Sequence, residues 1–117
     1  MSNPVTWFEI MGTDGNALHS FYSDLFGWKL QVLDEMNYGM VEGADGGIGG
    51  GIGESQNGGG QVTIYVQVDD PQAYLDKAEQ LGGRTVAPVT VIPDMVTFAQ
   101  FADPEGHVVG LVKAQPQ

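Results

Sequence analysis

The sequence comprises 117 residues with 42% hydrophobic side chains, no cysteine and a formal net charge of −11, from 15 acidic and 4 basic residues. This length and apolar content predict one folded domain over residues 1–117 rather than a disordered chain. The acidic excess argues against nucleic acid and membrane partners, because both need clusters of Lys and Arg. It would instead favour the approach of a cationic ligand. The lack of cysteine excludes a disulfide framework and thiolate chemistry.

Targeting signals are the next feature to consider. Residues 1–10 carry neither the charged segment nor the long apolar segment of a secretion signal. No apolar run approaches the roughly 20 residues that a membrane span requires. A cytoplasmic location is therefore the expectation.

The first half of the chain predicts a strand, a helix and three further strands. Residues 5–11 have strand character, and the apolar spacing becomes helical after Asp14. Asp14 and Asn16 are the candidate N-caps of this helix, and Gly27 is a natural C-terminal stop. Strands are expected over residues 28–33, 38–42 and 47–53, with a turn over residues 34–37.

The second half predicts the same order of elements. Residues 61–68 form the clearest strand, with alternating apolar and more polar positions. Asp70 and Pro71 then carry the N-cap and first-turn signals of a helix, which Gly82 and Gly83 end. Further strands are expected over residues 84–91, 95–101 and 107–113.

The two halves therefore repeat one supersecondary unit, strand–helix–strand–strand–strand. Trp7 corresponds to Thr63 and Ile52 corresponds to Leu111, an offset of roughly 56–59 residues. The repeat predicts an α+β fold of two tandem βαβββ modules. Module 1 covers residues 1–53, a linker covers residues 54–60 and module 2 covers residues 61–117, each bound being approximate.

Strand alternation divides the side chains between two faces of the predicted strands. The side chains expected to face the helices are Phe8, Ile10, Val62, Ile64, Val66 and Val68. Those expected on the opposite face are Val5, Trp7, Glu9, Met11, Thr63, Tyr65 and Gln67. This second face mixes aromatic, aliphatic and polar groups, which suits a small-molecule pocket. An ordinary sheet face closed by another sheet fits the alternation equally well.

Three segments resemble a known family. They are residues 20–28 (SFYSDLFGW), 81–83 (LGG) and 101–111 (FADPEGHVVGL). In that order, they are similar to the first helix, the end of the second helix and the closing hairpin of the glyoxalase / bleomycin-resistance / extradiol-dioxygenase superfamily, also called vicinal oxygen chelate. The doubled βαβββ order fits as well, so the resemblance covers nearly the whole chain. It implies a curved mixed sheet around a cavity, and a homodimer.

The resemblance also bears on metal binding. Enzymes of the family hold a divalent metal in the cavity through His, Gln or Glu at four strand positions, which fall here at Trp7, Gly51, Thr63 and Gly110. Tryptophan and glycine offer no side-chain ligand, and a neutral Thr hydroxyl is a poor one. We therefore expect neither a bound metal nor another cofactor.

Two histidines are further candidates for a metal site. His19 falls on the first helix among apolar residues, and we expect it on the helix surface or at its edge. His107 follows Gly106 in a tight turn, where a turn-stabilising role is favoured. Metal binding is the less favoured interpretation of both.

The glycine-rich stretch over residues 43–60 invites comparison with a phosphate-binding loop. It lacks both nucleotide-binding glycine patterns and precedes a strand rather than a helix. The repeat places residues 47–53 on the last strand of module 1, with Ile48 and Ile52 toward the helix. Gly49, Gly51 and Gly53 then face the cavity, which we expect them to widen.

Two functions of different classes remain open. The first, by analogy with the bleomycin-resistance branch, is metal-independent binding or sequestration of a small, mostly apolar molecule that can be cationic. The second is a glyoxalase-like lyase or isomerase that acts next to a carbonyl with Glu9 as general base. An interaction module without a small ligand is a third, weaker alternative. The expected ligand-binding residues are Trp7, Met11, Tyr38, Gly51, Thr63, Tyr65, Gln67, Phe98 and Gly110.

Overall fold

The computed structural model describes residues 3–44, 46–55 and 59–114. The chain divides into two compact units, one of residues 7–63 and the other of residues 1–6 and 64–117. We call these units the first and the second module. The N-terminal strand therefore starts in the second module, and the strand that opens the second repeat starts in the first.

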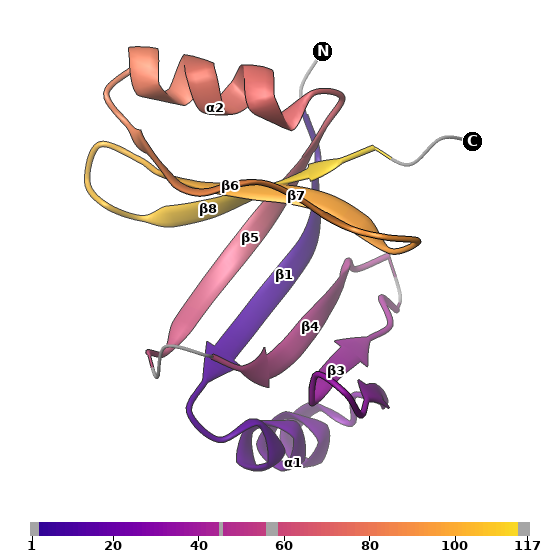
Figure 1. Ribbon diagram of the computed structural model, residues 1–117. Helices are drawn as coiled ribbons and strands as arrows, with labels where there is room; N and C mark the ends of the chain where they lie inside the picture. The colour runs from indigo at the N-terminus through magenta and orange to yellow at the C-terminus, as the bar shows by residue number, and fades with distance from the viewer. Residues whose placement is uncertain (1–2, 45, 56–58, 115–117) are drawn as a thin grey trace. The chain divides into compact units, whose positions relative to one another are not determined.

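The first repeat consists of β1 (Val5–Gly12), α1 (Gly15–Phe26), β2 (Leu30–Leu33), β3 (Tyr38–Val41) and β4 (Gly49–Glu54) (Figure 1). Its strand order is β2-β3-β4-β1, with β4 parallel to β1 and the other pairs antiparallel. Asp14 is the N-cap of α1, because its Oδ1 accepts a hydrogen bond from the Ala17 N–H at 3.1 Å. The helix ends at Gly27, whose φ of 72° favours glycine.

The second repeat consists of β5 (Gln61–Val68), α2 (Pro71–Gln80), β6 (Arg84–Ile92), β7 (Val96–Ala102) and β8 (Val108–Lys113). Its strand order is β6-β7-β8-β5, with β5 and β8 parallel. Asp70 caps α2 as Asp14 caps α1, since its Oδ1 accepts from the Ala73 N–H at 3.3 Å.

The pairing registers confirm the internal repeat. Ile10 on β1 pairs with Ile52 on β4, and Val66 on β5 pairs with Leu111 on β8. These pairs have the same offsets as those inferred from the sequence. The predicted α+β class, with two βαβββ modules and mixed strand directions, is confirmed.

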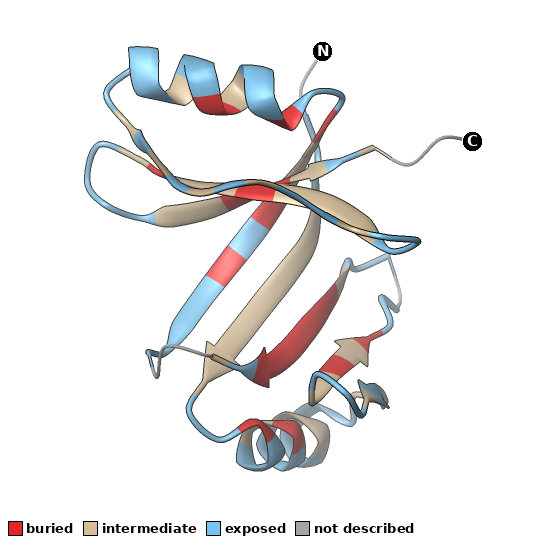
Figure 2. Cartoon of the chain, in the orientation of Figure 1, coloured by how far each residue is buried: buried red, intermediate tan, exposed pale blue. Residues whose placement is uncertain are grey.

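Each module has its own buried centre. In the second module, Val68, Leu75, Ala99 and Leu111 form a core in which each residue is exposed by 3% or less. In the first module, β4 is buried along most of its length (Figure 2), and Ile52 is fully buried. Burial of such side chains is the main favourable contribution to folding.

One prediction about β5 is wrong. Val62 and Ile64, expected to face a helix, are 72% and 44% exposed, whereas Val66 and Val68 do pack against the core of the second module. The reason is the length of the ladder, because β8 pairs with β5 only from Tyr65 onward. The layer covered by α2 therefore begins in the second half of the strand.

Some element boundaries also differ from the predictions. The second strand starts at Leu30 rather than at residue 28, because Trp28 packs in an aromatic cluster before the strand begins. The glycine-rich strand is shifted and includes Glu54, which the sequence pattern assigns to the linker. The remainder of that linker includes residues 56–58, which lie outside the described residues.

None of the described helices has the length and apolar character needed to cross a membrane.

Candidate functional site: two tyrosines over glycines

A chain of hydrogen bonds joins Trp7, Tyr38 and Glu9 on the face of the first module away from α1. The indole Nε1–H of Trp7 donates to the Tyr38 hydroxyl at 3.1 Å. That hydroxyl donates to Oε2 of Glu9 at 2.9 Å. All three side chains are half-buried. Glu9, the predicted general base, is thus part of a network that orients its carboxylate.

The glycines of β4 make this network possible. The Tyr38 ring lies directly over Gly51, where an added Cβ would overlap the ring and its hydroxyl. At Gly53 a Cβ would lie 2.8 Å from Cδ1 of the same ring. The predicted wider pocket over these glycines is therefore wrong, because a tyrosine from the neighbouring strand occupies the space.

The second module repeats this arrangement with different residues. The Tyr65 ring lies over Gly110, its partner in the β5–β8 register, and a Cβ on Gly110 would overlap that ring. The Gln100 side-chain amide donates to the Tyr65 hydroxyl at 2.9 Å. In each module, then, a tyrosine ring covers the central glycine, and its hydroxyl is hydrogen-bonded to a polar side chain.

These residues do not fit a metal ion. Two of the four positions implied by the family resemblance, Gly51 and Gly110, lie beneath tyrosine rings, and the third is the Trp7 indole. The fourth, Thr63, is buried, and its hydroxyl accepts a 2.6 Å hydrogen bond from Gln61. Among the described residues, no three His, Asp or Glu side chains are grouped as a metal site requires.

The two histidines have structural partners. His19 was expected at the helix surface, but it is only 8% exposed, and its Nε2 donates to the Ile52 carbonyl at 2.7 Å. It lies against Gly39, which leaves room for the imidazole ring. The expectation of a surface position is wrong because a glycine on β3 admits the ring beneath α1.

The predicted turn-stabilising role of His107 is confirmed. Its backbone N–H and its Nδ1 both contact the Asp103 carboxylate, at 2.9 and 3.0 Å. The His107 N–H, followed by the imidazole and the Glu105 N–H, holds the pKa of Asp103 below its ordinary value of 3.8, although desolvation opposes this shift.

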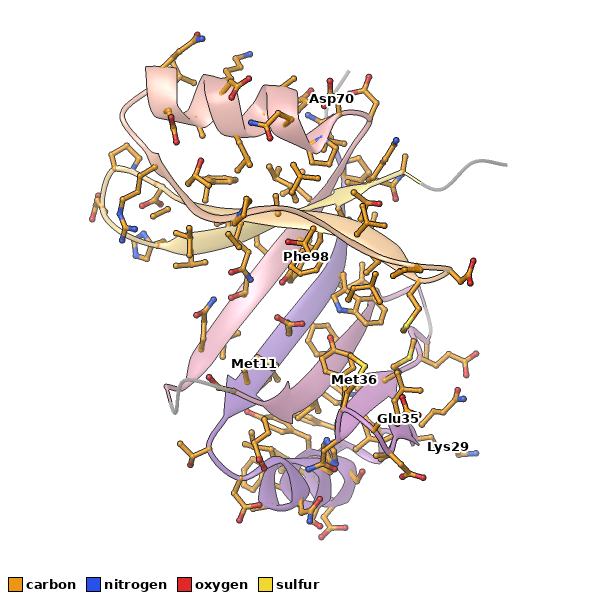
Figure 3. The ribbon with its side chains drawn as sticks, viewed as in Figure 1. Met11, Lys29, Glu35, Met36, Asp70 and Phe98 are labelled. Carbon is orange, nitrogen blue, oxygen red and sulfur yellow. The ribbon has the colours of Figure 1, made fainter. Side chains whose placement is uncertain are left out.

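The remaining predicted residues lie on the expected strands. Met11 on β1 and Phe98 on β7 are labelled in Figure 3. Met11 reaches toward Gly53, and Phe98 pairs with Val112 of β8. The backbone N–H of Gln67 donates to the Pro4 carbonyl at 2.8 Å.

Sequence reasoning missed Gln100 and a hollow beside Trp7. Gln100 lies two positions after Phe98, so strand alternation would have placed both on one face. The hollow belongs to the first module and has a volume of about 430 Å³. Besides Trp7, its lining includes Lys29, Gln31, Met40, Glu42 and Gly49. It offers aromatic and apolar surface with charged groups among its lining.

Comparison with known proteins agrees with this fold. Residues 5–44, which include β1, α1, β2 and β3, match the family described as bleomycin resistance protein-like N-terminal. CFP32 of Mycobacterium tuberculosis, which carries a provisional glyoxylase name, is 27% identical over 115 residues, covering 95% of this chain and 44% of CFP32. The anthracycline biosynthesis protein DnrV of Streptomyces peucetius is 26% identical over 118 residues, covering 86% of this chain and 43% of DnrV. The chain thus spans less than half the length of these curated relatives.

A solved structure shares the fold at lower identity. Methylmalonyl-CoA epimerase from Mycobacterium tuberculosis superposes with a TM-score of 0.68 at 14% identity, covering 96% of this chain and 88% of the epimerase. At this identity the likeness concerns the fold alone. The chain is thus similar in sequence to bleomycin resistance protein-like and glyoxylase-like proteins, and its fold is that of a solved member of the glyoxalase / bleomycin resistance protein / dioxygenase superfamily.

Proposed function

We propose that the chain binds a small, mostly apolar molecule without a metal ion, on the face of the first module that carries Tyr38. The observation that carries this proposal is the pair of tyrosine rings over Gly51 and Gly110. Each ring occupies a potential metal position, and the half-buried Tyr38 also offers an aromatic surface and a hydroxyl group, whereas Tyr65 is only 6% exposed. Binding surfaces of this type combine apolar walls with a few oriented polar groups.

The charge of the protein supports a cationic rather than an anionic ligand. The net charge is −11, and Glu9 contributes a carboxylate next to the aromatic surface of Trp7 and Tyr38. Aromatic faces and carboxylates both attract cations. An anthracycline is a suitable first probe, because it is a flat ring system with an amino sugar, and the relative DnrV is by name an anthracycline biosynthesis protein.

The test is a titration with daunorubicin, followed by the visible fluorescence of the drug and by calorimetry. Tyr38→Phe removes the hydroxyl that joins Trp7 to Glu9 and is expected to weaken binding about threefold to tenfold. Tyr74→Phe is the matched control, because Tyr74 lies on α2 and its hydroxyl contacts only Asn3 among the described contacts. The drug should be recovered chemically unchanged.

Native mass spectrometry of freshly purified protein provides an independent check. Retention of an organic molecule that is released intact on denaturation would support binding. Stoichiometric zinc, nickel, manganese or iron would contradict the metal-free proposal. The same spectra test the expected homodimer, which like the cytoplasmic location stays a proposal.

A second candidate is a lyase or isomerase reaction next to a carbonyl, with Glu9 as general base. The hydrogen bond from the Tyr38 hydroxyl to Oε2 of Glu9 favours it, because such a bond orients a carboxylate for proton abstraction. The epimerase of similar fold suggests an acyl-CoA thioester as substrate. The acidic excess argues against it, since coenzyme A is itself a polyanion.

Deuterium incorporation from heavy water distinguishes this candidate from simple binding. A catalyst would exchange the hydrogen on the carbon next to the thioester of methylmalonyl-CoA, and Glu9→Gln would abolish this exchange. Exchange that persists in Glu9→Gln would refute the assignment of Glu9 as base. If the wild-type protein shows no exchange while daunorubicin binds, the binding proposal stands alone.

A further inference from the structure

The two modules differ in how they fill the space between helix and strands. In the first module, the aromatic rings of Phe8, Tyr22, Phe26 and Trp28 contact one another, and only Phe26 among them is mostly exposed. Tyr22 and Trp28 stack with their centroids 5.9 Å apart and their planes 13° from parallel. Through Trp28, this cluster joins Tyr22 of α1 to Phe8 of β1.

The internal repeat identifies the corresponding positions in the second module. Tyr22 follows the Asp14 N-cap by the same number of residues as Ala78 follows the Asp70 N-cap. Ala78 therefore stands where the first module has a tyrosine. The second module lacks that ring.

The ladders identify the counterpart of Trp28 in the same way. Trp28 stands two residues before Leu30, which pairs with Val41. Gly83 stands two residues before Thr85, which pairs with Phe101. Val41 and Phe101 are equivalent positions. Val41 follows Met40, which pairs with Gly51, and Phe101 follows Gln100, which pairs with Gly110. The two stacked rings of the first module are thus replaced by a methyl group and a hydrogen atom.

A groove of about 370 Å³ lies at this place in the second module. Ala78 and Gly83 line it, together with the apolar side chains of Val66, Leu81, Phe101 and Leu111. Gly83 cannot be enlarged, because a Cβ there would lie 2.5 Å from the Ala102 carbonyl oxygen. Only Asn3, Tyr74, Lys77 and Asp103 contribute polar side chains to the lining. Because the other lining residues are apolar or glycine, the groove is mainly apolar.

We propose that this groove binds a flat, uncharged aromatic molecule of about two fused rings. The equivalent volume of the first module is occupied by two stacked rings, so the fold accommodates rings at this position. Leu81 at the groove is 69% exposed, and a bound ring would cover it. Val66 and Leu111 belong to the second module, whereas the face proposed above belongs to the first, so the two sites are separate.

The test uses N-phenyl-1-naphthylamine, an uncharged naphthalene whose fluorescence rises in apolar surroundings. Ala78→Phe adds a ring like that of the first module and is expected to weaken binding of this probe at least about tenfold. Ala73→Phe is the matched control, because it adds the same ring to an exposed position on the same helix. Equal binding of the probe to both variants would overturn the proposal.

Methyl NMR of the wild-type protein tests the site without any variant. The probe should shift the methyl resonances of Val66, Leu81 and Leu111 and leave those of Val41 and Ile52 in the first module unchanged. Shifts confined to the first module would overturn the proposal. Probe binding that weakens as the chain concentration rises would indicate that a second copy covers the groove, which also overturns it. Neither result depends on daunorubicin, so this proposal and the proposed function fail independently.

Discussion

Gly51→Ala tests the central feature of the candidate site. The new methyl group would overlap the Tyr38 ring and its hydroxyl, so the ring must move away. Its movement would break the hydrogen bonds from Trp7 and to Glu9, each worth about 0.5–1.5 kcal/mol. Overpacking adds about 1–3 kcal/mol. We expect the free energy of unfolding to fall by about 2–6 kcal/mol, a large part of the stability of a domain of this size.

Urea denaturation followed by far-UV circular dichroism measures this change. Gly60→Ala is the control, because a Cβ there would lie 3.8 Å from the Met11 carbonyl oxygen, an ordinary contact. Its effect should lie within about 1 kcal/mol of zero.

A double-mutant cycle identifies the cause of the destabilisation. If the Tyr38 ring is responsible, Gly51→Ala should have little effect in a Tyr38→Ala background. An equal loss of stability with and without the ring would refute the reasoning, because the cost would then arise in the β4 backbone itself.

Three further predictions concern the supports of the fold. Asp103→Asn should flatten the acid side of the stability–pH curve, because the His107 N–H lowers the pKa of Asp103 in the folded state. The contribution of the Asp103 carboxylate to the free energy of unfolding is complete above about pH 4. It is lost as the pH falls through the folded-state pKa. His19→Leu should lower the free energy of unfolding by about 1–3 kcal/mol, because a buried carbonyl on β4 loses its donor. Asp14→Ala and Asp70→Ala should each cost about 1 kcal/mol, and the two losses should add, because each residue caps a helix in a different module.

Each of these predictions has its own control. Asp94→Asn, which removes a carboxylate of another turn, is the charge-matched control for Asp103→Asn. Ser20→Leu, at an exposed position next to His19 on α1, should change stability by no more than about 0.5 kcal/mol. A loss in the Asp14→Ala, Asp70→Ala double variant that differs by more than about 0.5 kcal/mol from the sum would contradict independent capping.

The alternating β5 strand marks the limit of what strand periodicity can predict. The alternation correctly separates Tyr65 and Gln67 from Val66 and Val68. It does not reveal how far along the strand the covering helix extends, so it assigned Ile64 to a core that begins only after it. Periodicity identifies a face, whereas burial depends on neighbours that are distant in the sequence.

His19 and the β4 glycines show the same limit for individual residues. A histidine between apolar residues of a helix could lie on either side, and Gly39 on a distant strand admits it beneath α1. The glycines of β4 were expected to enlarge a cavity because their own side chains are absent. The Tyr38 ring fills that space, and the local sequence around Gly51 does not predict the position of this ring.

Residue types and their spacing are enough to predict the two-module repeat, the two Asp caps, the glycine stop of α1 and the absence of ligand side chains at the family's metal positions. These features depend on residue type and on spacing within a few turns or strands, which local backbone geometry constrains directly. The packing of each module places Tyr38 and Tyr65 over Gly51 and Gly110, and it leaves a groove in the second module where the first has stacked rings. Those outcomes depend on which side chains from separate strands and helices share one volume, and packing determines this only when the whole module is assembled.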